Sequence, residues 1–135
     1  MAQIIVHKNE NGNVTITYPT PEFLETHTIE DVKSKDTPEH SIIVDDSILP
    51  QGDDAQFFDA WELNGTTVTV NITKAKAFKL AQYNAIALQE AQKRQLNTLA
   101  GLPNTPDDTT WLAKLTADRA AIEAANTTTQ LTQIN

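Results

Sequence analysis

The stretch TKAKAFKLAQYNAIALQEAQKRQLNTLA, residues 73–100, contains no glycine or proline and is rich in alanine and leucine. This composition favours a helix, and Gly101 followed by Pro103 is typical of a helix end. We therefore predict one helix of about 28 residues, about 42 Å long at about 1.5 Å per residue. Such a helix is longer than a small sheet can cover, so part of it should project.

Two apolar stripes run along this predicted helix. The first stripe has the three- and four-residue spacing of a coiled-coil seam and comprises Phe78, Ala81, Ala85, Leu88, Gln92, Gln95 and Leu99. The second stripe comprises Leu80, Tyr83, Ala87 and Ala91. One interpretation is a helical hairpin in which Trp111, Leu112 and Leu115 fold back on the first stripe. The alternative is packing between chains, in which the two glutamines would weaken the seam and select its register.

Downstream of Gly101, the sequence predicts a second helix and a last helical turn. The second helix should begin near Thr105, which would cap it, with Pro106 in its first position and Asp107 and Asp108 facing the helix dipole. The last turn, after residues 126–129, should hold Leu131 and Ile134.

The front half of the chain is typical of a β-rich domain. Thr28 and Asp31 form a capping-box pattern that predicts a short helix. Asn64-Gly65 is a strong hairpin signal. The apolar runs predict strands at residues 4–6, 14–18, 42–44, 57–63 and 66–72. The expected fold class is α+β: an acidic domain at 1–72, with a small antiparallel sheet and one short helix, then a long helix and a C-terminal helical hairpin at 73–135.

The charge is distributed unevenly over these two parts. Residues 1–72 hold three bases and thirteen acids, whereas residues 73–135 hold seven bases and five acids, for a net charge of −8. Nucleic acid is not an expected ligand, because the acidic half would repel phosphates. The chain has no cysteine, which excludes disulfides and thiolate sites. Neither a secretion signal nor an apolar run of about 20 residues is present, so we expect no membrane association.

No catalytic motif is recognisable. The serines and histidines lie in no nucleophile elbow or zinc-type spacing, and the four glycines form no phosphate-binding loop. We therefore expect a protein that is not an enzyme and has no cofactor. A metal-dependent hydrolase is an alternative built on one acidic cluster, which comprises Asp45, Asp46, Asp53, Asp54 and Asp59. These acids fail the calcium-loop pattern and are better explained as turn caps and solvated side chains.

The aromatic residues after this cluster should lie on two faces if they form a strand. Phe57 and Trp61 would then point to one side and Phe58 to the other. One side must face the core. The other is either covered by the long helix or forms a small exposed docking patch.

Three short motifs are distinctive: Lys35-Asp36-Thr37-Pro38, residues 43–50 (IVDDSILP) and Phe58-Asp59-Ala60-Trp61-Glu62. They resemble motifs of small tailed-bacteriophage proteins. The end of the chain, from Ala121 to Leu131, is also similar to such proteins, which include tail fibre assembly and tail assembly chaperone families. The chain departs from their Leu-Arg-Asp helix ending, because Leu115 is followed by Thr116, Ala117 and Asp118.

This resemblance implies a non-enzymatic role in tail or tail-fibre morphogenesis, as an assembly factor or a minor virion component. It implies a place in the host cytoplasm during assembly, or in the virion tail. The partners would be other phage structural proteins, or a second copy bound through the long helix. The expected contact residues are Trp61, Phe78, Leu80, Tyr83, Leu88, Leu99 and Trp111. An alternative is an acidic inhibitor that mimics nucleic acid and binds a host protein.

Overall fold

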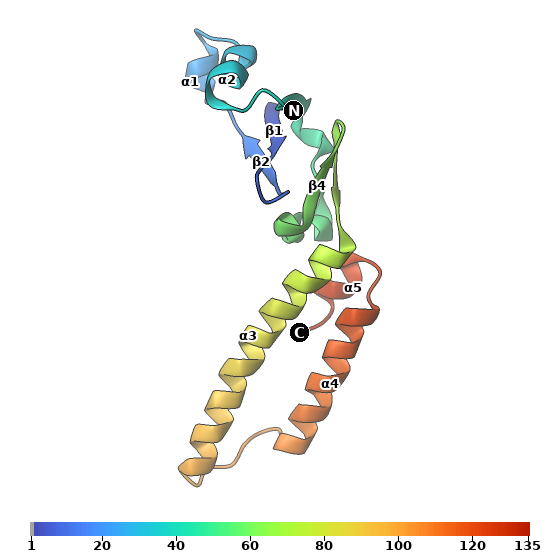
Figure 1. Cartoon of the computed structure of the whole chain (residues 1–135). Coiled ribbons are helices and arrows are strands. Elements are labelled where there is room, and N and C mark those ends of the chain that lie inside the picture. Colours follow the sequence, from blue (N-terminus) through green and yellow to red (C-terminus); the bar gives the residue numbers. More distant parts are fainter. Residues whose placement is uncertain (1) are drawn as a thin grey trace. The chain divides into compact units, whose positions relative to one another are not determined.

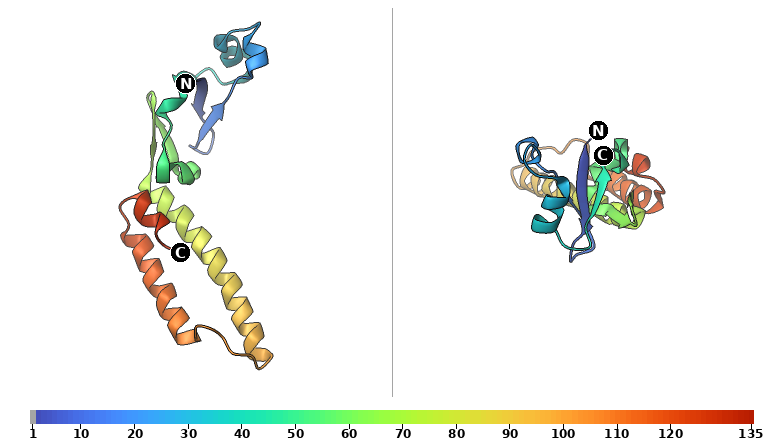
Figure 2. Two further views of the ribbon diagram at one scale, coloured as in Figure 1. Left: turned by 180° about the vertical axis from the view of Figure 1, so that it is seen from behind. Right: turned by 90° about the horizontal axis from the view of Figure 1, so that it is seen from above.

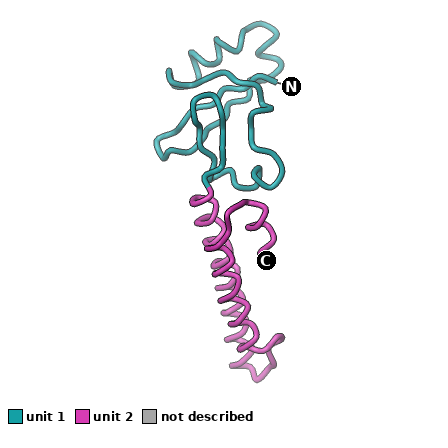
Figure 3. The backbone as a smooth tube through the Cα atoms, turned by 90° about the vertical axis from the view of Figure 1, so that its right-hand side faces the viewer, with its two compact units in different colours: residues 1–71 teal, residues 72–135 magenta. Residues whose placement is uncertain are grey.

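The computed structural model describes residues 2–135 and has the α+β fold class expected from the sequence (Figure 1). The chain divides into two compact units, Met1–Asn71 and Ile72–Asn135, which are coloured separately in Figure 3. Unit 1 holds all five strands, and unit 2 is entirely helical within the described part of the chain.

Unit 1 is built around a three-stranded antiparallel sheet with the order β2-β1-β3. Its strands are β1 (Gln3–Lys8), β2 (Val14–Thr17) and β3 (Ile42–Asp45). The central strand, β1, carries apolar side chains on both faces because each face packs against other apolar residues. Ile4 and Val6 pack in one cluster with Trp61, while Ile5 packs in another with Ile29 and Val32. This arrangement explains why the run at residues 4–6 does not alternate between apolar and polar side chains.

A second, two-stranded sheet completes the strands of unit 1. It consists of β4 (Trp61–Asn64) and β5 (Thr67–Val70), with Asn64 paired to Thr67. The turn therefore consists of Gly65 and Thr66 and not of Asn64 and Gly65. Gly65 has a φ of 62°, which suits the first position of a type II′ turn. The two sheets replace the single sheet expected from the sequence.

The predicted strand at residues 57–63 is wrong in its first half. Residues Gly52–Ala60 form η2, two short 3-10 segments that meet at Phe57, where φ is −106° and ψ is 46°. The indole Nε1 of Trp61 donates a hydrogen bond of 3.0 Å to the carbonyl oxygen of Asp54 and ties this segment to β4. The alternating aromatic faces expected from a strand therefore do not form.

Short capped segments join the strands. These are α1 (Pro21–Leu24), which the sequence did not predict, α2 (Ile29–Asp36) and η1 (Asp46–Ile48). The capping box of α2 is confirmed: Asp31 N–H donates to the Thr28 hydroxyl at 3.3 Å, and Thr28 N–H donates to the Asp31 carboxylate at 2.9 Å. These two bonds satisfy backbone donors that the helix start leaves open.

Unit 2 consists of a helical hairpin and a final short helix, seen from two further sides in Figure 2. Its elements are α3 (Ile72–Leu99), α4 (Asp108–Ala124) and α5 (Thr128–Thr132). The bounds of α3 lie one residue from the predicted ones. The predicted cap of α4 is wrong, because Asp107, not Thr105, accepts a 2.8 Å hydrogen bond from the N–H of Thr110.

The helix α5 and the residues after it pack against the hairpin. Leu131 and Thr128 of α5 are buried, as are Ile134 after it, Ile122 of α4 and Ala125, which follows α4. Lys114 Nζ donates a 2.6 Å hydrogen bond to the carbonyl oxygen of Asn135 and so fixes the last described residue to α4. Among residues 2–135, no helix combines the length and apolar character needed to cross a bilayer.

Candidate protein-docking site on the helical hairpin

The second stripe of α3, and not the first, faces α4. Tyr83 donates a 2.5 Å hydrogen bond from its hydroxyl to Asp118 Oδ2, and Asn84 Oδ1 accepts a 3.0 Å hydrogen bond from Arg119 Nε. The prediction that α4 folds back on the first stripe is therefore wrong around Tyr83 and Asn84. Nearer the connecting loop, Gln95 and Leu99 of the first stripe do line a groove with Trp111 and Leu112. The second stripe presents small residues, Ala87 and Ala91, toward α4, and these leave room for the large Trp111 ring.

A polar cluster fixes the middle of the hairpin. Asp118 accepts hydrogen bonds of 2.5 Å from both Tyr83 and Lys114. Partial burial, then the hydrogen bond to Asp118, raise the pKa of Tyr83 to about 12. Partial burial opposes ionisation of Asp118, but the hydrogen bonds from Lys114 and Tyr83 outweigh it and lower the pKa of that carboxyl. Lys79 adds a smaller attraction through space. In this cluster the Tyr83 phenol keeps its proton and the Asp118 carboxylate keeps its negative charge. Their hydrogen bond joins α3 to α4.

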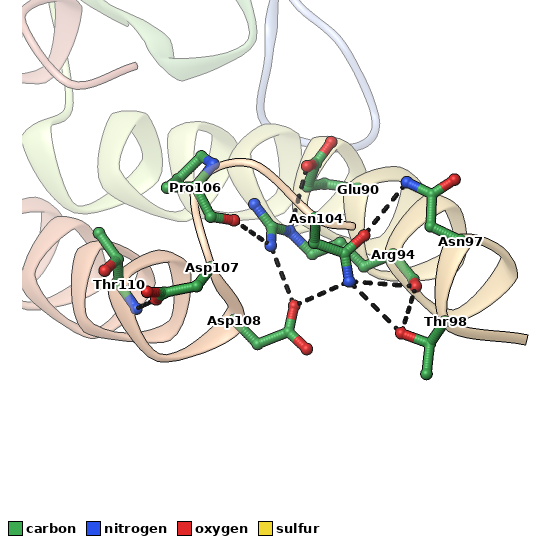
Figure 4. Close-up of polar contacts among 9 residues, drawn as sticks. All are labelled: Glu90, Arg94, Asn97, Thr98, Asn104, Pro106, Asp107, Asp108 and Thr110. Atoms are coloured by element: carbon green, nitrogen blue, oxygen red, sulfur yellow. Dashed lines mark hydrogen bonds and ion pairs between the residues drawn. The ribbon is translucent and has the colours of Figure 1, made fainter. Parts of the chain in front are cut away.

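A buried arginine joins the two helices at the loop end of the hairpin (Figure 4). Arg94 is only 5% exposed, and its Nη1 donates to the Pro106 carbonyl oxygen at 2.7 Å and to Asp108 Oδ1 at 3.0 Å. Its Nε lies 3.1 Å from Glu90 Oε1. Asn104 joins the same cluster by donating to Asp108 Oδ1 at 3.2 Å. The guanidinium therefore links α3, the connecting loop and the start of α4.

The Arg94 guanidinium also lies over the Trp111 ring, with Cζ 4.9 Å from the ring centroid. Beside it runs an apolar groove of about 380 Å³ between the distal halves of α3 and α4. Its lining includes Ala91, Leu99, Trp111 and Leu112. Arg94 does not make this groove an anion site, because Asp108 and Glu90 already balance its charge.

Six residues of the first stripe, together with Leu96, form what we call the outer face of α3. All seven are exposed: Ala81, Ala85, Leu88, Gln92, Gln95, Leu96 and Leu99. The leucines are the most informative, since Leu88 is 59% exposed, Leu96 68% and Leu99 79%. Single exposed leucines are ordinary, but three on one side of a helix form an apolar patch of the kind that binds other proteins.

The structure places the seven expected contact residues in different surroundings. Leu88 and Leu99 lie on the outer face, whereas Tyr83 and Trp111 are held by Asp118 and Arg94. Phe78 and Leu80 are half-buried near the start of α3.

Trp61 is 5% exposed and packs in the core of unit 1 with Ile4, Val6 and Val68. It therefore does not belong to the candidate surface. Leu96 does belong to the candidate surface. The sequence did not predict it as a contact residue because Leu96 lies beside the seam and not within it.

The acids of the cluster in unit 1 are not gathered into a group of metal ligands. Over residues 2–135, no group of three or more acidic, histidine or cysteine side chains is arranged to hold an ion. Asp45 instead accepts a 2.9 Å hydrogen bond from the N–H of Ser47 and caps η1, which confirms the capping interpretation at that position. The backbone hydrogen bond from Ser47 lowers the pKa of Asp45, as expected for a capping carboxylate.

The chain was also compared with known proteins. No protein-family model, curated protein or solved structure matches it. The geometry of unit 2 is therefore the main guide to function.

Proposed function

We propose that the chain is a non-enzymatic bacteriophage protein that acts in tail or tail-fibre morphogenesis through protein–protein contacts. The observation that carries the contact role is the outer face of α3, which exposes Leu88, Leu96 and Leu99 along one side of a rigid hairpin. The phage assignment rests on the three short motifs of unit 1 that resemble small tail-associated proteins.

The hairpin suits a docking role because its polar contacts are made outside that face. The Tyr83–Asp118 and Arg94–Asp108 pairs fix α3 to α4. Gln95 and Leu99 lie at the edge of the outer face, where they also line the groove beside Trp111. A surface presented on a preformed helix binds at a lower entropic cost than a flexible segment. The chain would act in the host cytoplasm during assembly, with retention in the virion tail as the alternative.

A substitution in the phage that encodes the chain tests this role. Leu88→Gln combined with Leu99→Gln removes two apolar side chains while keeping good helix formers. We expect fewer complete tails or fibres by electron microscopy of the particles. Ile86→Gln is the matched control: Ile86 is 63% exposed on the same helix, about 160° around the axis from Leu88.

Normal particle yield from the Leu88/Leu99 variant, with unchanged helix content by circular dichroism, would contradict the docking role. Mass spectrometry of purified virions separates the two forms of the proposal. A fixed copy number indicates a virion component, and absence indicates an assembly factor.

A further inference from the structure

We infer that His7 and His40 make unit 1 sensitive to mild acid, because a proton taken up by His7 loosens the packing of β1 against its neighbours. This inference does not depend on the docking role proposed above. The two imidazole rings lie edge to face, with their centroids 5.8 Å apart. All three histidines of the chain belong to unit 1, so the side chains that ordinarily titrate just below neutral pH are confined to that unit.

His7 lies on the central strand of the three-stranded sheet. The pairing of β1 with β3 extends to Val6, so Ser41 stands opposite His7 at the next position of the register. Ser41 is only 3% exposed. His7 lies on the same face of β1 as Ile5, because side chains alternate along a strand, and α2 packs against that face. A charge on His7 would therefore lie at the edge of a packed apolar layer.

Two polar atoms at this position are buried without a hydrogen-bond partner among residues 2–135. They are Nδ1 of His7 and Oγ of Ser41. A neutral imidazole carries one proton, which Nε2 can hold, whereas a charged imidazole carries a proton on both nitrogens. Protonation of His7 would thus place a new N–H donor and a positive charge at a buried Nδ1 that has no acceptor. Burial favours the neutral ring.

His40 brings a second titratable ring close to the first. It lies in the connection between α2 and β3, and its Nε2 donates a 3.1 Å hydrogen bond to the carbonyl oxygen of Lys8. A carbonyl oxygen can only accept, so Nε2 of His40 carries a proton whether the ring is neutral or charged. The bond therefore holds His40 beside β1 in both states. When both rings are charged, they repel each other.

The other groups around His7 do not offset this repulsion. Thr15 of β2 and Ser41 stand opposite His7 and are uncharged, and α2 covers this face with apolar side chains. Burial, and then the charge of His40, lower the pKa of His7 from its ordinary value of 6.5. The unfolded chain therefore binds this proton more readily than the folded chain. The stability that neutral His7 contributes is complete above pH 6.5 and is lost as the pH falls below it.

Urea unfolding of the full chain at two pH values tests the inference. Trp61 lies in the core of unit 1 and Trp111 in unit 2, so tryptophan fluorescence in a Trp111→Phe background reports on unit 1 alone. We expect a lower urea midpoint at about pH 5.5 than at about pH 7.5, a range in which carboxylates of ordinary pKa stay ionised. The pH difference is compared within each variant, so that the effect of a substitution on stability itself cancels.

Three variants locate the sensitivity. His7→Gln should remove most of the difference in midpoint between the two pH values. His40→Gln should remove a smaller part, because burial acts on the pKa of His7 more strongly than His40 does. His27→Gln is the matched control and should leave the difference unchanged. His27 is exposed, and its ring stacks on that of Phe23, with the centroids 4.1 Å apart.

Nuclear magnetic resonance titration of the histidine ring protons in the wild-type chain is a second measurement that requires no variant to fold. The His7 ring should titrate below pH 6.5 in the folded chain, and His40→Gln should move that titration to higher pH. The inference is overturned by a His7 ring that titrates at pH 6.5 or above, or by an equal pH difference in the wild type and His7→Gln. A pH difference that His27→Gln removes would also overturn it.

Discussion

Replacing Arg94 by Met should destabilise unit 2 by about 2 kcal/mol. The lost hydrogen bond from a charged donor to the Pro106 carbonyl oxygen costs about 1.5 kcal/mol. The lost stacking on Trp111 costs about 1 kcal/mol. The ion pairs add only about 0.5 kcal/mol, because the Asp108 and Glu90 side chains are 59% and 34% exposed. Replacing the buried guanidinium by an uncharged methionine side chain regains about 1 kcal/mol of stability, because no charge then has to be desolvated.

Urea unfolding followed by far-ultraviolet circular dichroism measures this loss. The signal comes mainly from unit 2, since α3 and α4 have 28 and 17 residues, against 4 and 8 in α1 and α2. Lys93→Met is the matched control, because the neighbouring side chain is exposed and has no described partner. The Lys93→Met variant should change the free energy of unfolding by no more than about 0.5 kcal/mol.

The result that would refute this account is equal stability of the Arg94→Met and Lys93→Met variants. A second check is the double variant with Asp108→Asn. Because Arg94 and Asp108 share one cluster, the two effects should be smaller together than the sum of the single losses. Strict additivity would mean that the 3.0 Å contact carries no coupling energy.

Three further predictions concern the hairpin. Asp107→Ala should lower the free energy of unfolding in urea by about 1 kcal/mol, because Asp107 caps α4. Thr105→Ala should leave it nearly unchanged, and the reverse order would contradict the assignment of the cap. Tyr83 has a raised pKa of about 12, so its contribution is complete below pH 10.0 and is lost as the pH rises to about 12. Tyr83→Phe should remove that part of the alkaline loss in melting temperature. Asp118 has a lowered pKa, so its contribution is present above pH 3.8 and is lost as the pH falls; Asp118→Asn should flatten the acid limb.

Local signals in the sequence predicted the elements that depend on neighbouring residues. The long helix, the Thr28–Asp31 capping box and the short helix before Ile134 all follow from composition and caps within a few positions. The errors lie where distant contacts decide. Residues 57–60 have strand-like aromatics, yet the hydrogen bond from the Trp61 indole to the Asp54 carbonyl favours a tight 3-10 segment instead.

The orientation of α3 was the most consequential error. Larger apolar side chains are usually the buried ones, so the stripe with Leu88 and Leu99 was the natural choice to face α4. The structure turns the other stripe toward α4, and on that side Arg94 bonds to Asp108 and to the Pro106 carbonyl oxygen of the connecting loop. A buried arginine paired through a loop leaves no periodic signal in the sequence.

The size of the outer face bears on whether the proposed partner is held transiently or permanently. Burying a fully exposed leucine yields about 1.5–3 kcal/mol, so three leucines that are 59–79% exposed supply about 3–6 kcal/mol in total. Association costs at least about 4 kcal/mol in lost translational and rotational freedom. Apolar burial on this face therefore roughly cancels that cost, and the net affinity depends on the remaining contacts of the interface. Such a surface suits a partner that is bound and released during assembly, and we expect the chain to be absent from purified virions.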